Sequence, residues 1–129
     1  MTGLRAVDPA TESVTFLVVN AGSFAWGIEA AQVESVRAPG DLEVTVDAAR
    51  LGVPCDPTAS PRVVQLHGAA RTGVVVRGQM AIVTVSRAEI QELPAFLTAS
   101  MTHRTFSSVV LAANQSFLVV DADALRGSW

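Results

Sequence analysis

The sequence predicts an all-β fold of the barrel class, built from two similar halves. Many short apolar segments alternate with turn residues along the 129 residues, and few segments have helical periodicity. In addition, residues 44–51 and 118–125 are copies of one another in residue type. Each copy is an apolar strand that stops at an Asp and continues as a short helical turn, where the carboxylate accepts hydrogen bonds from unpaired N–H groups. A unit used twice at this separation indicates two related halves.

The sequence pattern of the first half predicts a hairpin followed by two further strands. The hairpin rests on a nearly continuous apolar run, a turn, and a strand in which Phe24, Trp26 and Ile28 alternate with small or polar residues. Pro39 and Gly40 favour a type II turn. The expected elements are a strand at 14–20, a turn at 20–23, a strand at 24–29, a helical turn at 30–32, a strand at 33–36, a turn at 38–41 and a strand at 42–46.

The Pro-rich segment 52–61 is the expected connector between the halves. The second half repeats the pattern of short apolar strands and turns found in the first. Ser86 and Glu89 form a capping box that opens a short helix ending at Pro94, and residues 95–104 give no assignment. The expected elements are a hairpin at 62–67 and 72–76, a strand at 80–85, a helix from 87 to about 93, and a hairpin at 107–112 and 116–120.

These strands predict a core of thirteen largely buried side chains. They are Phe16, Val18, Trp26, Ile28, Val46, Val64, Leu66, Val74, Val76, Ile82, Val109, Leu118 and Val120.

Composition excludes several classes of partner. The chain has a net charge of −3, and all nine of its cationic residues are Arg, so it lacks the clustered basic face that nucleic acid or an anionic membrane surface requires. A single Cys, the absence of an apolar signal core and the absence of a membrane-spanning run predict a cytoplasmic protein. We expect residues 1–12 to form a flexible tail and residues 13–129 to form one domain.

Other chemistry is weakly indicated, and no cofactor or metal site is predicted. Cys55 could pair with His67 or His103, but nucleophilic catalysis also needs an orienting group and an oxyanion site. These three residues lack zinc-ligand spacing. Asp47 and Asp121 could be paired carboxylates, but their identical settings favour helix caps.

Several motifs, in order, resemble the CheW-like family of chemotaxis adaptor domains. These are residues 16–19 with the turn at Gly22, the Trp-Gly-Ile segment 26–28, the Val-x-x-Val segment 33–36, the strand ending at Asp47, the segment 73–78 with Arg77 where Asp is usual, residues 89–94, and the closing strand 118–121. The resemblance covers roughly residues 14–126. Its main support is that the motifs occur in the same order along the chain as in the family.

The resemblance implies two interleaved SH3-like barrels that share a hydrophobic seam. It also implies a non-enzymatic scaffold that links a chemoreceptor's cytoplasmic helical hairpin to a CheA-type histidine kinase or to a full-length CheW-like adaptor. By resemblance, the receptor site lies near the seam and contains Val33, Ser35, Val36, Gly73 and Val75.

One departure from the family pattern lies between Val36 and the strand at 42–46. The family normally carries a longer insert there, with an additional strand, whereas this chain has only the turn 38–41. The first barrel should therefore lack a strand and expose an edge along 33–36 or 42–46. Shortened adaptors of the FrzB type are understood to keep receptor binding but not kinase binding, and the family's kinase contacts depend on complete barrels.

A second class of function remains open, namely a small β-barrel enzyme or ligand-binding module. A pocket converging on two or more titratable residues would favour that class. An exposed, mostly aliphatic surface without such a cluster would favour the scaffold.

Overall fold

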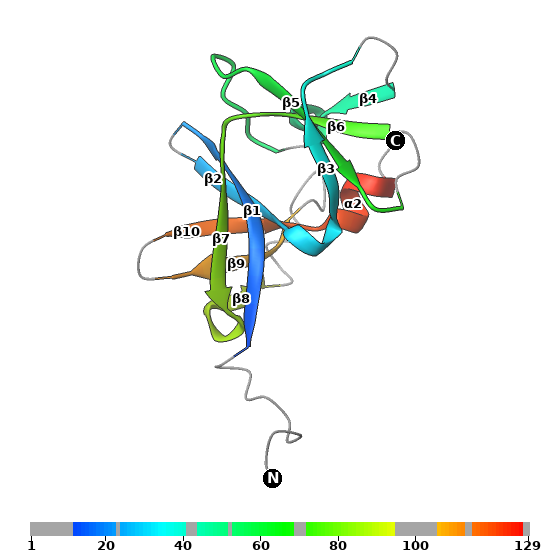
Figure 1. The fold of residues 1–129 in the computed structure, drawn as a ribbon. Coiled ribbons are helices and arrows are strands. Elements are labelled where there is room, and N and C mark those ends of the chain that lie inside the picture. The colour runs from blue at the N-terminus through cyan, green and yellow to red at the C-terminus, as the bar shows by residue number, and fades with distance from the viewer. Residues whose placement is uncertain are drawn as a thin grey trace.

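The computed structural model describes residues 12–22, 24–40, 44–51, 53–68, 72–94, 106–112 and 115–127. Within these residues the fold is all-β, with two curled sheets and only short helical segments (Figure 1). The strands are β1 (Ser13–Ala21), β2 (Phe24–Glu29), β3 (Val33–Arg37), β4 (Val44–Asp47), β5 (Pro61–Leu66), β6 (Thr72–Arg77), β7 (Gln79–Ser86), β8 (Ile90–Glu92), β9 (Phe106–Leu111) and β10 (Ser116–Val120). The helical segments are η1 (Ala30–Gln32), η2 (Ala48–Leu51), η3 (Arg87–Glu89) and α2 (Ala122–Gly127).

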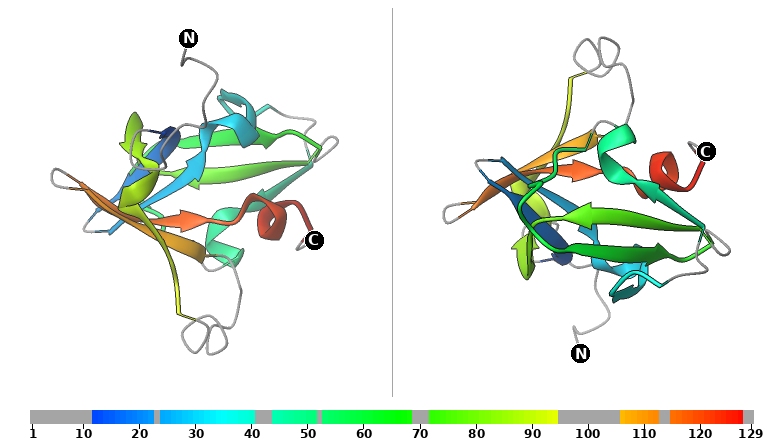
Figure 2. Two further views of the ribbon diagram at one scale, coloured as in Figure 1. Left: turned by 90° about the horizontal axis from the view of Figure 1, so that it is seen from below. Right: turned by 90° about the horizontal axis from the view of Figure 1, so that it is seen from above.

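The strands form a six-stranded sheet of order β7-β1-β2-β10-β9-β8 and a four-stranded sheet of order β3-β5-β6-β4. Figure 2 shows the two sheets on opposite sides of the molecule, with α2 beside their junction. Neighbouring strands are antiparallel except for β10 with β2 and β4 with β6, which are parallel. Because β7 continues through η3 into β8, the two edge strands of the larger sheet are joined, and that sheet curls into a barrel.

The two halves of the sequence are interleaved in space. The first half places its hairpin, β1–β2, in the six-stranded sheet and its later strands, β3 and β4, in the four-stranded sheet. The second half does the reverse, with the β5–β6 hairpin in the smaller sheet and β7 to β10 in the larger one. The two sheets therefore exchange strands, and residues 53–60 connect the halves as predicted.

The repeated sequence unit occupies equivalent places in the two sheets. β4 and β10 are the strands in parallel pairing, and each ends at an Asp that opens a helical turn. The Asp47 carboxylate accepts from the Ala49 N–H at 3.0 Å, and the Asp121 carboxylate accepts from the Asp123 N–H at 2.9 Å. The prediction that both Asp side chains are helix caps is confirmed.

The larger core lies between the sheets and corresponds to the predicted hydrophobic seam. It combines buried residues from both sheets, from η2, from the connector and from α2, and the indole N–H of Trp26 donates to the Pro54 carbonyl at 3.0 Å. Its buried members are Leu17, Val19, Trp26, Ile28, Ala48, Val53, Val64, Leu66, Val74, Val76, Val120, Ala122 and Leu125.

A second core fills the barrel of the six-stranded sheet. Phe16 and Phe117 meet edge to face there, with ring centroids 5.3 Å apart. Its buried members are Val14, Phe16, Val18, Val85, Val110, Phe117 and Val119. Alternate residues of β1 therefore pack into the two different cores. Because both faces of the strand are buried, its sequence is a nearly continuous apolar run.

Most of the predicted core is confirmed, with one clear error. Ile82 is 67% exposed, because it lies on an edge strand, on the face of β7 away from the barrel core. Val109 and Leu118 are only partly buried, and the side chain of Val46 lies outside the described residues. The confirmed members are Phe16, Val18, Trp26, Ile28, Val64, Leu66, Val74, Val76 and Val120.

The predicted helix after Ser86 is also wrong in length. Both hydrogen bonds of the capping box are present, but the helical segment stops at Glu89 and Ile90 already belongs to β8. Ile90 packs against the barrel core and pairs with Val110, so tertiary pairing overrides the local helix signal.

Among the described residues, the four-stranded sheet has no counterpart of β9. When the two strand orders are compared, β3, β5, β6 and β4 correspond to β7, β1, β2 and β10, and the larger sheet then continues to β9. Since β9 directly precedes β10 in the chain, a counterpart would directly precede β4. The shortened first barrel stays a prediction. Among the described residues, β3 and β4 each pair along one side only.

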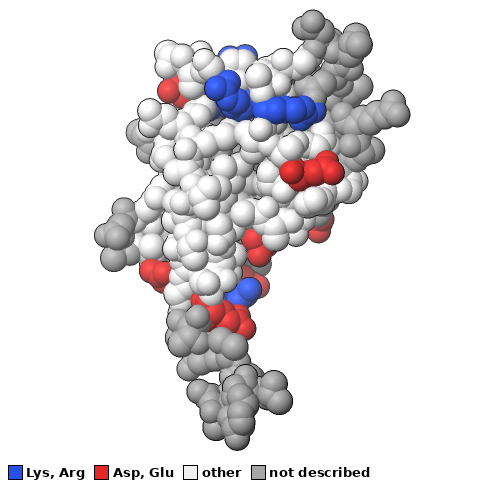
Figure 3. Space-filling view, in the orientation of Figure 1, with Lys and Arg blue, Asp and Glu red and all other residues white. Residues whose placement is uncertain are grey.

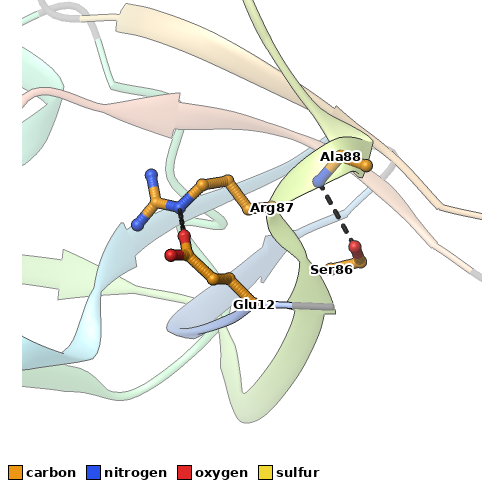
Figure 4. Close-up of polar contacts among 4 residues, drawn as sticks. All are labelled: Glu12, Ser86, Arg87 and Ala88. Atoms are coloured by element: carbon orange, nitrogen blue, oxygen red, sulfur yellow. Dashed lines mark hydrogen bonds and ion pairs between the residues drawn. The ribbon is translucent and has the colours of Figure 1, made fainter. Parts of the chain in front are cut away.

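Glu12, at the start of the described chain, contacts Arg87 at the turn between β7 and β8 (Figure 4). The Arg87 backbone N–H donates to the Glu12 carbonyl at 2.9 Å, and the Arg87 Nε lies 2.7 Å from the Glu12 carboxylate. Both side chains are about half exposed, so the ion pair contributes only about 0.2–1 kcal/mol. No helix within the described part of the chain is long and apolar enough to cross a membrane.

Replacing Trp26 by Ala should lower the free energy of unfolding by about 3–5 kcal/mol, because it empties the seam and leaves the Pro54 carbonyl without its donor. Urea denaturation measures this. The control is Ile82→Ala, which should change stability by less than about 0.5 kcal/mol since that side chain is exposed. Equal effects of the two substitutions would contradict the seam as the main core.

Candidate functional site

The structure divides the five predicted receptor-site residues between the two faces of the smaller sheet. Val36 pairs with Val64 and Val33 pairs with Leu66, and both partners are buried in the seam, so Val33 and Val36 lie on the seam face. Ser35 pairs with Gln65, which pairs with Gly73, and Val75 lies two residues further along β6. Ser35, Gly73 and Val75 therefore lie on the opposite face.

Gly73 is buried rather than available to a partner. The Val63 side chain lies over it, so closely that a Cβ at this position would collide with that side chain. Gln65 beside it is also buried. A glycine here serves the packing of β5 against β6, and it does not form the floor of an accessible groove.

Uncharged side chains that are exposed or partly exposed lie on the seam-side face of β7 and β1, and Val36 is exposed at a seam-facing position of β3. We call these residues together the front strip, which consists of Thr15, Val36, Met80, Ile82 and Thr84. Met80, Ile82 and Thr84 alternate along β7 on one face, and the Thr84 and Thr15 hydroxyls are 2.9 Å apart. Ile82 is 67% exposed and Val36 is 40% exposed, although both occupy seam-facing positions.

Figure 3 shows this face with almost no charged atoms over β7 and β1. Basic atoms lie above it, with acidic atoms to their left, and further acidic atoms lie to its right, at its lower left and, with basic ones, at its foot. The foot carries Glu12, Arg87 and Glu89, of which Glu12 and Arg87 form an ion pair. The strip is thus an uncharged surface with charges only at its margins.

Sequence reasoning missed Ile82 as a surface residue. Both faces of β7 are rich in apolar residues, since Val83 and Val85 pack into the barrel while Met80 and Ile82 point the other way. An amphipathic alternation would have identified the exposed face, but this strand has none. The available signal was the polar pair Thr84 and Ser86, which alternate along β7 on this face, with Thr15 opposite Thr84.

A separate open pocket of about 760 Å³ lies where β4 and β6 end. Asp47, Cys55 and Arg77 line it, together with Ala49, Val53, Pro54 and Pro57. Three ionisable side chains therefore converge, which meets the criterion for a ligand-binding module. The Asp47 carboxylate is engaged with the Ala49 N–H, and the Cys55 thiol lies 3.6 Å from the Val53 carbonyl.

The pocket does not contain a thiolate–imidazole pair within the described residues. Burial raises the pKa of the Cys55 thiol, and the charge of Asp47 acts in the same direction, so the thiol is protonated at neutral pH and is a poor nucleophile. His67 follows the far end of β5, about 20 Å from the strand start that pairs with Arg77. His103 lies outside the described residues.

Asp47 and Asp121 do not form a paired-carboxylate site, because each caps a helical turn at the end of a different sheet. In the part of the chain that the structure describes, no group of three or more His, Cys, Asp or Glu side chains is arranged to hold a metal ion.

Comparisons with known proteins give a structural relative and no sequence relative. No family model matches the chain, and no curated protein matches it. Among solved structures, it is similar to the scaffolding protein TtCheW from Thermoanaerobacter tengcongensis, with a TM-score of 0.63 and 11% sequence identity. The match covers 85% of this chain and 90% of that one. The chain therefore has the fold of a CheW-type scaffolding protein, an all-β fold with SH3-like barrels.

Proposed function

We propose that this protein is a non-enzymatic adaptor of a bacterial chemosensory system, which binds the helical hairpin at the cytoplasmic tip of a chemoreceptor. The observation that carries the proposal is the front strip on a CheW-type fold. The fold supports a scaffolding role, and the strip offers an exposed aliphatic surface without a catalytic cluster.

The chemistry of the strip suits a helix more than an extended peptide. Exposed aliphatic side chains on β7 and β3 present a surface for a row of aliphatic residues on one face of a helix. The centre of the strip carries almost no charge. A partner can therefore exclude water from it without burying an unpaired charge, which would be costly. The proposal keeps Val33 and Val36 in the receptor site and adds Met80 and Ile82. Ser35, Gly73 and Val75 face away from this surface.

Asp substitutions at Ile82 or Val36 should abolish receptor binding while the protein stays folded. Each would place an unpaired carboxylate in the desolvated centre of the interface. Isothermal titration with a cytoplasmic hairpin fragment of the cognate receptor measures binding, and circular dichroism checks the fold.

Leu111→Asp is the matched control, because Leu111 is 52% exposed on β9, outside the front strip. Its affinity for the receptor fragment should equal that of the wild type. Undiminished binding by folded Ile82→Asp and Val36→Asp variants would show that the receptor docks elsewhere.

We further propose that the missing strand weakens binding to a CheA-type kinase. The counterpart of β9 would have paired with β4, so the smaller sheet presents less of the surface that barrel-to-barrel docking uses. A shortened adaptor of this kind would occupy receptor sites without recruiting the kinase. The complete second barrel is the part of the protein that could still hold the kinase.

Titrating the regulatory, adaptor-like domain of the kinase against this protein should give a Kd weaker than about 1 µM. Binding at that level or tighter corresponds to about −8 kcal/mol and would show that the shortened barrel has not cost the protein its kinase contact. A full-length CheW-like adaptor serves as the positive control.

The pocket beside Cys55 favours a second candidate function, a small-ligand-binding module. One carboxylate, one guanidinium and one thiol line an open cavity of about 760 Å³. If a ligand occupies it, a fragment screen followed by NMR should find compounds whose chemical-shift changes centre on Cys55 and Ala49. The variant Arg77→Ala should lose those shifts. A screen without such compounds would leave the adaptor as the only supported function.

A further inference from the structure

We infer that Arg62 fixes the direction in which the receptor helix lies along the front strip, by pairing with an acidic side chain near one end of that helix. The inference rests on the proposed function, because it concerns the same docking surface. It adds a specificity-determining residue and states the charge that the partner must carry.

Register places Arg62 at the head of the front strip. Arg62 pairs with Val76, whose side chain is buried in the seam, so Arg62 projects from the seam side of the smaller sheet. Val36 pairs with Val64 on the neighbouring strand. Arg62 and Val36 are therefore diagonal neighbours on one face, about 7–8 Å apart at the backbone.

A small cavity connects Arg62 with the start of β7, at the same end of the surface. Arg62 and Met80 both line a hollow of about 270 Å³, together with Ala59, Ser60, Gly78 and Gln79. Met80 lies two residues before Ile82, on the same face of β7. Arg62 thus lies between the β3 and β7 contributions to the strip, and the hollow beside it has room for a side chain of the partner.

The guanidinium of Arg62 is available to a partner. The residue is exposed, and its Nη1 donates to the carbonyl of the adjacent Pro61 at 3.1 Å. Among the described residues, no carboxylate forms an ion pair with it. A guanidinium with free donors binds a carboxylate through two parallel hydrogen bonds, which fixes geometry as well as charge.

The opposite end of the strip carries more acidic than basic groups among the described residues. Glu12, Arg87 and Glu89 lie at this foot, and their three charges sum to −1. The strip therefore has Arg62 at its head, an uncharged centre and, among the described residues, an acidic foot. A helix with an aliphatic stripe and an acidic residue at one end is attracted in one orientation and repelled in the reverse one.

Neutralising Arg62 should weaken receptor binding moderately and reduce its dependence on salt. We expect Arg62→Gln to raise the Kd for the cytoplasmic receptor hairpin about two- to fivefold at low salt, and Arg62→Glu to raise it about tenfold. The control is Leu111→Gln, because Leu111 is exposed on β9, outside the front strip. Its Kd should remain within twofold of the wild type.

Charge reversal on the partner then identifies the contact. Acidic residues flanking the aliphatic stripe of the receptor hairpin are changed to Lys one at a time, and each is titrated against wild type and Arg62→Glu. One Lys variant should weaken binding to the wild type and restore binding to Arg62→Glu. Wild-type binding that Ile82→Asp abolishes but that Arg62→Gln and Arg62→Glu leave unchanged would overturn this inference alone. Failure of the wild type to bind the hairpin would overturn the proposed function, and this inference with it.

Discussion

The structure depends on a hydrophobic seam that neither sheet can fill alone. Trp26 and Ile28 come from the larger sheet, Leu66 and Val74 come from the smaller one, and Leu125 comes from α2. Because the seam closes only when both sheets are in place, the interleaved strands fold as one unit rather than as two barrels joined by a linker. Gly78 shows how tight this exchange is. It carries the chain from β6 to β7, and a Cβ there would lie 2.6 Å from the Asn20 carbonyl.

Duplication explains both the regularity of the fold and its asymmetry. Each half contributes a hairpin to one sheet and an Asp-capped strand to the other. Ala48 and Ala122, which directly follow the two capping Asp residues, are buried at equivalent positions in the seam. The halves differ in what precedes the capped strand, since β9 lies before β10 and no counterpart lies before β4 in the described residues. The seam is complete without such a counterpart, because β5 and β6, which supply the smaller sheet's share of the seam, lie at the centre of that sheet.

The equivalent edge strands of the two sheets, β3 and β7, shape the surface. Where the smaller sheet ends at β3 and the larger one at β7, seam-facing positions reach solvent, and Val36 and Ile82 become exposed. Neither residue has an unusual chemical property. Their exposure on an uncharged face supports the proposed docking surface, and in that proposal the charges at its head and foot would set the direction of the partner helix. Hydrophobic burial would provide most of the affinity of such an interface, whereas Arg62 would provide orientation.

The sequence by itself determined the local elements and the family of fold. Turn residues, apolar runs and the repeated Asp-capped unit predict the hairpins, the helix caps, the two halves and most of the core, because these features depend on neighbouring residues. Only the tertiary structure decided which apolar side chains at the sheet edges stay exposed. Ile82 and Val74 look alike in sequence, but one lies on an edge strand and the other at the centre of a sheet. Likewise, Val36 and Gly73 share a predicted site yet lie on opposite faces, because side-chain direction alternates along a strand and pairing register sets the face.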